Sequence, residues 1–414
     1  MRVLLFEQWQ GGHYFNYIEC LVPGLAAIAD EVVVALTDVA ASSERFRTQL
    51  APLFALPNVR LDRQVQVPTE EGRLAFRLRL GRNVVEAIER SRPDYVFLPS
   101  ADEQILALPL QGVRFRRLRE TPVEAVIHYK AYTATASTRD RAVSTVQRQL
   151  LKTGVFSQLN FVNFLQYEDA LARRFPWAGM ARAAGDPVPQ GVRMDRTLAR
   201  RELGIELEGR YIGMVGDLDA RKAVPATIAA FRCAPLARTE RLLLAGKLAP
   251  AYARLIHDEH QDLVRDGRLI VIDRFLSDSE LACCFAAIDV HSSAYHSFLG
   301  LSSLMLKSLA SGVPVIVNEG GWGAAIVRRF EVGQTINPQR TLDYAASLRA
   351  ALDASAQYRE TPPVARLLRF HSVENFVQGV VQRAAAFAGH SPLTPVLPWS
   401  WVLESLPEER RALR

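Results

Sequence analysis

Two adjacent cations, Arg221 and Lys222, lie in a polar loop of the stretch "VGDLDARKAVPATIAAF" (215–231), after a predicted strand that ends at Gly216. An apolar-faced helix is predicted to follow, so both cations stand at its N-terminus, where they oppose the helix dipole. Arginine binds a phosphate through paired hydrogen bonds, and lysine acts on it as a point charge. The pattern therefore indicates a bound anion; the alternative is two solvated surface cations.

A glycine pair follows the first apolar run, in "QGGHYFNY" (10–17), and places Gly11, Gly12 and His13 just before a predicted helix. Paired glycines let backbone approach a ligand closely, and the free N–H groups of the next helix favour an anion. The spacing is not GxGxxG, so it does not indicate a classical NAD site. The alternative is a plain tight turn.

A third loop precedes the helix of "FLGLSSLMLKSLASGVPVI" (298–316), where Gly300, Ser302 and Ser303 offer N–H and hydroxyl groups to an anion. The strand that follows ends in "VNEGGWGAAI" (317–326), a further glycine-rich loop. One such loop is weak evidence. Several at the carboxyl edge of one sheet indicate a nucleotide cleft.

Three single residues stand at positions typical of a site. His128 ends the predicted strand "VEAVIHY", and Asp102 follows the preceding strand in the equivalent place. His296 lies, with Tyr295, just before the Gly/Ser loop. A lone histidine is more often structural than catalytic, so each of these residues is a candidate for a functional site, and the alternative is a structural role.

The elements that must position these residues alternate between apolar strands and helices. Near-continuous Val/Ile/Leu runs separated by helices predict parallel sheets covered on both faces. The predicted strands are 2–6, 31–37, 58–65, 94–100 and 123–129, and then 210–217, 241–247, 268–274, 287–293 and 313–319. A Gly/Pro-rich linker, "AGDPVPQGV" (184–192), separates the two series.

The fold class is therefore α/β, with two doubly wound, Rossmann-like domains facing a shared cleft. We expect an N-terminal domain over 1–188, a C-terminal domain over 189–385, and a tail over 386–414 that packs back on the body through its tryptophans.

Composition excludes several classes. The chain has 414 residues, enough for two or three domains, and no apolar run long enough for a membrane-spanning helix. The four cysteines fit neither a zinc site nor a redox CxxC motif. The N-terminus lacks the apolar core of a signal peptide, so we expect a cytoplasmic protein.

The net charge of +6 fits a phosphorylated ligand, anionic lipid or nucleic acid, and the last is the weakest because no nucleic-acid-binding motif is present. Basic stretches at 73–82 and 114–120 could touch anionic lipid at the inner membrane face; the alternative is a solvated helix face.

Taken together, these motifs resemble the GT-B glycosyltransferases, specifically the retaining family-4-like (group 1) enzymes. The segment "LSDSELACCFAAIDVHSSAYHSFLGLSSLMLKSLASGVPVIVNEGGWG" (276–323) carries most of the resemblance, together with the "RK" loop, the GG turn and His128. The resemblance implies sugar transfer from a nucleotide-sugar donor to an unknown acceptor (glycan, lipid-linked or small molecule), with retention and without metal or other cofactor.

The resemblance also implies residue roles. Arg221 and Lys222 would neutralise the donor diphosphate as it leaves, and His128 would lie near the transferred sugar. The remaining donor-side candidates are Gly11, Gly12, Gly216, Gly300, Ser302, Ser303 and Lys307. His13, Asp102 and His296 are candidates for the acceptor or sugar side.

Lys307 is a departure from the family pattern. The family usually carries two glutamates, eight residues apart, and the second accepts hydrogen bonds from the ribose; here Leu299 and Lys307 stand at those positions. An ammonium group only donates, so it cannot replace a carboxylate on a diol. The sequence resembles more closely an atypical branch with a "gSS" loop.

Two alternatives to a transferase stay open at this point. A GT-B epimerase or phosphorylase would keep the fold and change the chemistry. A catalytically degenerate protein that binds a nucleotide sugar or a partner would explain the missing glutamates, because fold alone does not fix function.

Overall fold

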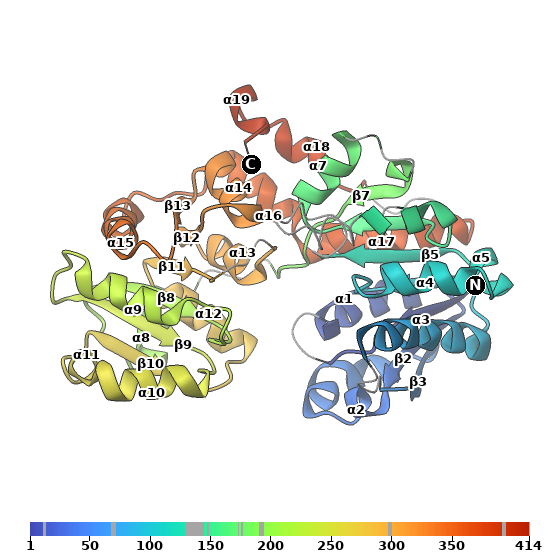
Figure 1. Ribbon diagram of the computed structural model, residues 1–414, viewed down its shortest axis with the longest axis horizontal. Coiled ribbons are helices and arrows are strands. Elements are labelled where there is room, and N and C mark those ends of the chain that lie inside the picture. The colour runs from blue at the N-terminus through green and yellow to red at the C-terminus, as the bar shows by residue number, and fades with distance from the viewer. Residues whose placement is uncertain are drawn as a thin grey trace. The chain divides into compact units, whose positions relative to one another are not determined.

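The computed structural model describes residues 1–10, 14–67, 72–128, 145–146, 149–172, 174, 177–189, 194–296, 300–390 and 395–413. The chain forms two compact units. Unit 1 comprises Met1–Pro187 and Phe370–Trp399, and unit 2 comprises Val188–Arg369 and Ser400–Arg414. Each is built around one parallel sheet (Figure 1).

Unit 1 has a seven-stranded sheet of order β3-β2-β1-β4-β5-β6-β7, with every neighbouring pair parallel. Its strands are β1 (Arg2–Phe6), β2 (Glu31–Thr37), β3 (Val59–Val65), β4 (Tyr95–Leu98), β5 (Val123–Ile127), β6 (Gln158–Phe161) and β7 (Ala181–Ala183). The central strands are almost wholly buried because helices cover both faces, which explains their Val/Leu-rich sequences.

The described α-helices of unit 1 lie between these strands in the sequence, except α17, which comes from the C-terminal part of the chain. They are α1 (Tyr14–Ala26), α2 (Asp38–Ala41), α3 (Gly72–Ser91), α4 (Gln104–Gly112), α5 (Arg116–Glu120), α7 (Phe164–Ala172) and α17 (Val373–Phe387). A π-helical turn (Phe46–Leu50) and 3₁₀ turns (Ala51–Ala55, Leu151–Thr153 and Ala178–Met180) lie in the loops.

Unit 2 has a six-stranded parallel sheet of order β10-β9-β8-β11-β12-β13. Its strands are β8 (Arg210–Val215), β9 (Glu240–Ala245), β10 (Leu269–Ile272), β11 (Val290–Ser293), β12 (Val315–Asn318) and β13 (Gly333–Ile336). Its helices are α8 (Arg196–Glu202), α9 (Val224–Cys233), α10 (Pro250–Glu259), α11 (Gln261–Arg265), α12 (Asp278–Ala287), α13 (Ser303–Ala310), α14 (Gly321–Phe330), α15 (Thr341–Ser355), α16 (Pro362–Phe370), α18 (Trp399–Leu403) and α19 (Glu408–Arg411). The expected α/β class with two Rossmann-like sheets is therefore present.

The compact units differ from the expected domains toward the C-terminus, where the predicted tail over 386–414 is divided between unit 1 and unit 2. The sequence placed residues up to 385 in the C-terminal domain, whereas Phe370–Trp399 belongs to unit 1. The physical reason is the packing of α17 on α1, where the Phe376 ring meets the Tyr17 ring edge-on at 5.0 Å. Figure 1 shows α17, in red, among the blue and green elements of unit 1.

The C-terminal tail has contacts of its own within each unit. In unit 1, the ring of Trp399 stacks on Phe164 with centroids 4.5 Å apart. In unit 2, Arg329 Nε donates to the Leu413 carbonyl at 2.6 Å, and Arg410 pairs with Glu331 at 2.7 Å. These contacts hold the ends of the tail against folded structure.

Gly24 tests the packing of α17. A Cβ atom there would lie 3.0 Å from Val381 Cγ2 and 3.1 Å from Val377 Cγ1. We expect Gly24→Leu to lower the free energy of unfolding by about 1–3 kcal/mol through overpacking, as measured by urea unfolding. Gly179→Leu is the matched control, because nothing lies within 4 Å of its added Cβ. Equal effects of the two substitutions would contradict this account.

Candidate functional site

Each sheet has one point where the chain reverses its direction of winding. In unit 2 it lies between β8 and β11, and in unit 1 between β1 and β4. Ligands of open α/β sheets bind beyond the carboxyl ends of the strands at this switch point. The loops that follow these four strands are therefore the first places to examine.

The loop after β8 begins with a glycine that no other residue could replace without strain. Gly216 has a φ of 92°, and an added Cβ would lie 2.4 Å from Leu304 Cδ1. The left-handed backbone and the close packing of α13 both require the missing side chain. This turn directs the following residues across the carboxyl edge of the sheet.

Arg221 is largely exposed and is paired within its own loop. Its Nε and Nη2 atoms donate to Asp219 Oδ2 at 2.9 and 2.7 Å, and its backbone N donates to Oδ1 at 2.9 Å. Partial burial raises the pKa of Asp219, but these hydrogen bonds outweigh that effect and hold the pKa below its usual value. Asp219 thus fixes the loop conformation that presents the neighbouring lysine.

Lys222 is buried, with a relative exposure of 2%. Its Nζ atom donates to the Val215 carbonyl at 2.8 Å and lies 5.3 Å from the centroid of the Tyr295 ring. Within the described part of the chain, no carboxylate lies at ion-pair distance from this ammonium group. A buried charge without a counter-ion is costly, so the position favours an anionic ligand.

The loop after β11 is joined to the Lys222 loop. Ala223 N donates to Ala294 O at 3.1 Å, and His296 N donates to Arg221 O at 2.9 Å. Asn318, at the end of β12, accepts from Tyr295 N at 2.7 Å and donates back to its carbonyl. The two switch-point loops therefore form one rigid surface, although the side chain of His296 itself is exposed.

A small hollow of about 20 Å³ opens on this surface. Its lining includes Tyr295, Gly300, Ser302, Asn318, Gly320 and Gly323. Burial raises the pKa of Tyr295, but the charge of Lys222 and hydrogen bonds from Ser302 and Ser293 outweigh it, so the pKa is lowered overall. A tyrosine perturbed in this direction marks a locally positive environment.

Two helix N-termini add to this positive environment. Helix α13 begins at Ser303 with Ser302 as its N-cap, and α14 begins at Gly321 with Gly320 (φ 94°) as its N-cap. The first-turn N–H groups of a helix lack intrahelical acceptors and carry partial positive charge. With Lys222 nearby, the hollow is suited to phosphate oxygens.

Lys307 does not line this hollow. Its Nζ donates to Asp278 Oδ1 at 2.9 Å, at the first residue of α12. The cation is thus held by a carboxylate on a neighbouring helix.

In unit 1, two predicted residues are brought together. His128 follows β5 and Asp102 follows β4, and His128 Nδ1 lies 3.1 Å from Asp102 Oδ2. The backbone N of His128 also donates to this carboxylate at 3.2 Å. Both side chains are buried, and a carboxylate at Nδ1 favours the tautomer that carries its proton there.

Three residues that the sequence did not single out lie beside this pair. The Tyr17 hydroxyl donates to Asp186 Oδ1 at 2.6 Å, and its ring meets the His128 ring edge-on at 5.3 Å. His371 Nδ1 accepts from Asp186 N at 2.8 Å, and burial lowers the pKa of His371 to about 3. Only Tyr17 had a signal in the sequence, since it follows the glycine pair.

Glu7 is a further residue that the sequence analysis missed. It follows β1 and is completely buried, and its Oε1 atom accepts from Gln8 N at 2.8 Å and Trp9 N at 3.0 Å. Burial outweighs these hydrogen bonds and raises the pKa of Glu7 to about 8. Its carboxyl is therefore mostly neutral at pH 7. The signal available was an acidic residue directly after an apolar strand.

Four predicted residues, Gly11, Gly12, His13 and Leu299, lie outside the described residues. Among those described, no group of three or more His, Cys, Asp or Glu side chains is arranged to hold a metal ion. No described helix is long and apolar enough to cross a membrane.

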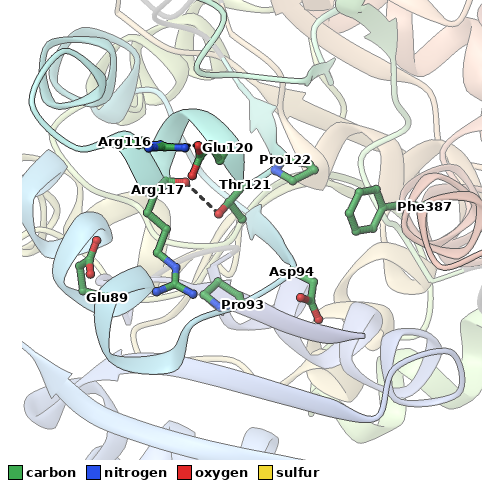
Figure 2. A pocket seen from close by; sticks show the side chains of 9 residues that line it. All are labelled: Glu89, Pro93, Asp94, Arg116, Arg117, Glu120, Thr121, Pro122 and Phe387. Atoms are coloured by element: carbon green, nitrogen blue, oxygen red, sulfur yellow. Dashed lines mark hydrogen bonds and ion pairs between the residues drawn. The ribbon is translucent and has the colours of Figure 1, made fainter.

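A larger hollow of about 490 Å³ lies at the amino ends of β4 and β5, away from the switch point. Figure 2 shows that both charge signs line it, with Arg116 and Arg117 of α5 near Glu89 of α3 and Glu120. Because these charges offset one another, the hollow offers no clear preference for an anion.

Comparisons with solved structures show the fold. The chain is similar to Anabaena HepE in complex with UDP-glucose (TM-score 0.66, 15% identity, 93% of this chain and 100% of that one). It is also similar to a sucrose-phosphate synthase from Thermosynechococcus elongatus (TM-score 0.69, 17% identity, 94% of this chain and 100% of that one). A third similar structure is the lipopolysaccharide outer core galactosyltransferase WaaB (TM-score 0.61, 12% identity, 94% of this chain and 99% of that one). The predicted GT-B fold is thereby confirmed. No protein-family model matches the chain, and a search of curated proteins finds no match.

Glu7 makes stability depend on pH. Its pKa is about 8 in the folded chain and 4.5 when exposed, so the unfolded chain ionises first and stability is lost as pH rises through this window. We expect Glu7→Gln to abolish a loss of about 3–4 kcal/mol in the free energy of unfolding between about pH 5 and pH 8. Urea unfolding at both pH values measures it. An unchanged difference between the two pH values would show that Glu7 is already ionised in the folded chain.

Proposed function

We propose that this protein is a glycosyltransferase that moves a sugar from a nucleotide-sugar donor to an acceptor. Unit 2 would bind the donor and unit 1 the acceptor. The observation that carries this proposal is the buried ammonium group of Lys222 at the switch point of unit 2. The donor diphosphate would supply the counter-charge that the described residues lack.

The chemistry follows from the same group. When the bond between the sugar and the diphosphate breaks, negative charge grows on the leaving phosphate. A buried cation and helix N–H groups aimed at that phosphate stabilise the transition state more than the ground state. Arg221, Gly216, Gly300, Ser302 and Ser303 would complete the phosphate site, with Arg221 exchanging its bond to Asp219 for one to the ligand.

The likeness to HepE, which was crystallised with UDP-glucose, favours a UDP-sugar as the donor. We further propose that the anomeric configuration is retained and that no metal is required, because Lys222 and the N-termini of α13 and α14 would provide positive charge at the phosphate. We keep Lys307 as a donor-side candidate, in a role for which it would have to exchange its bond to Asp278 for one to the ligand.

In unit 1, the Asp102–His128 pair is proposed to lie at the transferred sugar, where an oriented imidazole can accept a hydrogen bond from a sugar hydroxyl. His13 and His296 remain candidates for the same side. The acceptor would be a glycan, a lipid-linked sugar or a small molecule.

Lys222→Met tests the proposed phosphate site. Methionine keeps an unbranched side chain that is one heavy atom shorter and removes the charge, and we expect turnover of the accepted nucleotide sugar to fall about 30- to 1,000-fold. Hydrolysis or transfer with a panel of UDP- and GDP-sugars provides the measurement. Lys247→Met is the matched control, because Lys247 also follows a strand of this sheet but is exposed and paired with Asp273 at 3.2 Å. Equal rates for the wild type and Lys222→Met would refute the assigned role.

We also propose a cytoplasmic location and a peripheral contact with anionic lipid. A groove of about 640 Å³ between α3 and α4 is lined by Arg79, Arg82, Arg114, Leu78, Leu110 and Phe115. Val113, next to it, is 74% exposed. Guanidinium groups beside exposed apolar side chains are typical of surfaces that rest on anionic membranes.

Vesicle co-sedimentation tests this contact. Reversing two charges, in Arg82→Glu with Arg114→Glu, should lower the fraction bound to anionic vesicles by at least about tenfold, since each basic residue contributes about 1 kcal/mol. The matched control reverses Arg254 and Arg265, which are exposed on unit 2. Binding that is insensitive to the anionic lipid content, or equal in both variants, would remove the proposal.

A further inference from the structure

The carboxyl end of β1 carries two consecutive buried polar side chains whose hydrogen bonds are incomplete. Glu7 is 1% exposed and Gln8 is 4% exposed. In the described part of the chain, Glu7 Oε2 and both amide atoms of Gln8, Oε1 and Nε2, have no hydrogen-bond partner. Three polar atoms are thus withdrawn from water at one place.

Such atoms are costly in a folded protein. Each buried polar group without a partner costs about 1–3 kcal/mol, and native structures rarely leave several of them together. A ligand that completes the hydrogen bonds explains why such atoms occur together. The position of Glu7 and Gln8 supports a ligand there, because β1 stands at the switch point of unit 1, where β2 lies on one side and β4 on the other.

The three atoms also define the chemistry of the ligand. A protonated carboxyl both donates and accepts, and a primary amide offers two N–H donors and one acceptor. Burial raises the pKa of Glu7 to about 8, so its carboxyl keeps the proton it needs to donate at pH 7. Neither side chain is a cation, so the pair matches neutral hydroxyl groups better than a phosphate or a carboxylate.

We infer that the carboxyl end of β1 is a subsite for the hydroxyl groups of a neutral sugar, held by Glu7 and Gln8. This inference rests on the proposed function, in which unit 1 binds the acceptor. The Glu7 carboxyl and the Gln8 amide each exchange hydrogen bonds with one or two hydroxyl groups of the sugar.

The subsite is adjacent to the Asp102–His128 pair along the sheet edge. Asp102 follows β4, the direct neighbour of β1, and His128 follows β5, the next strand along. Neighbouring strands lie about 4.8 Å apart, so a sugar ring held at β1 spans much of the way to His128. The inferred subsite therefore lies next to the place proposed for the transferred sugar at the Asp102–His128 pair.

Binding measurements on the full chain test this inference. Glucose, galactose and mannose, and the 6-phosphate of each, serve as probes, with saturation-transfer NMR and titration calorimetry as readouts. We expect at least one neutral sugar to bind, and both Glu7→Met and Gln8→Leu to weaken that binding by about tenfold or more. Glu7→Gln, which keeps a donor and an acceptor, should stay within about threefold of the wild type.

Glu124→Gln is the matched control. Glu124 is also a fully buried glutamic acid of unit 1, and burial raises its pKa to about 7, but it lies near the amino end of β5. Its oxygens accept from Tyr95, Gln158 and Asn160, so it has no bond to offer a ligand. Sugar binding should be unchanged in this variant.

Three results would overturn the inference: no neutral sugar binds, Glu7→Met and Gln8→Leu bind as tightly as the wild type, or the 6-phosphates bind more tightly than the neutral sugars. UDP binding, measured in parallel, keeps the tests separate. If the wild-type protein does not bind UDP, that result counts against the proposed function. The sugar-binding results test the subsite independently of it. If Glu7→Met prevents folding, Gln8→Leu decides the outcome, and if Gln8→Leu prevents folding, the comparison of Glu7→Met with Glu7→Gln decides it.

Discussion

The buried ammonium group of Lys222, which has no carboxylate partner among the described residues, is the constraint on which the candidate site of unit 2 depends. Its Nζ atom donates to the Val215 carbonyl and lies 5.3 Å from the centroid of the Tyr295 ring. The N-termini of α13 and α14 add positive potential, and the lowered pKa of Tyr295 reflects the charge of Lys222 beside it. The turn at Gly216 and the Arg221–Asp219 pair fix the loop that carries Lys222, and the Asp219 carboxylate is bound by Arg221.

Unit 1 repeats the topology with the opposite chemistry. Around its switch point the strands are followed by carboxyls, an imidazole and a phenol: Glu7, the Asp102–His128 pair and the Tyr17–Asp186 pair. Such groups are able to donate to and accept from neutral hydroxyl groups. In the proposed function, the carboxyl edge of the sheet would bind a phosphate in unit 2 and a sugar in unit 1.

The sequence predicted the elements whose burial is simple. Strands β1, β2 and β8 are continuous apolar runs and lie where they were expected. Strand β6 was missed because Gln158 and Asn160 are polar, and their role becomes visible only when they bond to the buried Glu124. The sequence analysis also missed that α17 packs in unit 1, because the amphipathic pattern of a helix does not indicate which sheet the helix covers. Within the site, the sequence predicted the same role for Arg221 and Lys222. Only the structure shows that Arg221 is exposed and paired with Asp219, whereas Lys222 is buried.

The most direct test of the central claim is a crystal structure of the protein with UDP-glucose. The account predicts a diphosphate oxygen within hydrogen-bond distance of Lys222 Nζ, with further oxygens at the N-termini of α13 and α14. A nucleotide whose phosphates lie elsewhere, leaving Lys222 bonded only to Val215, would contradict it.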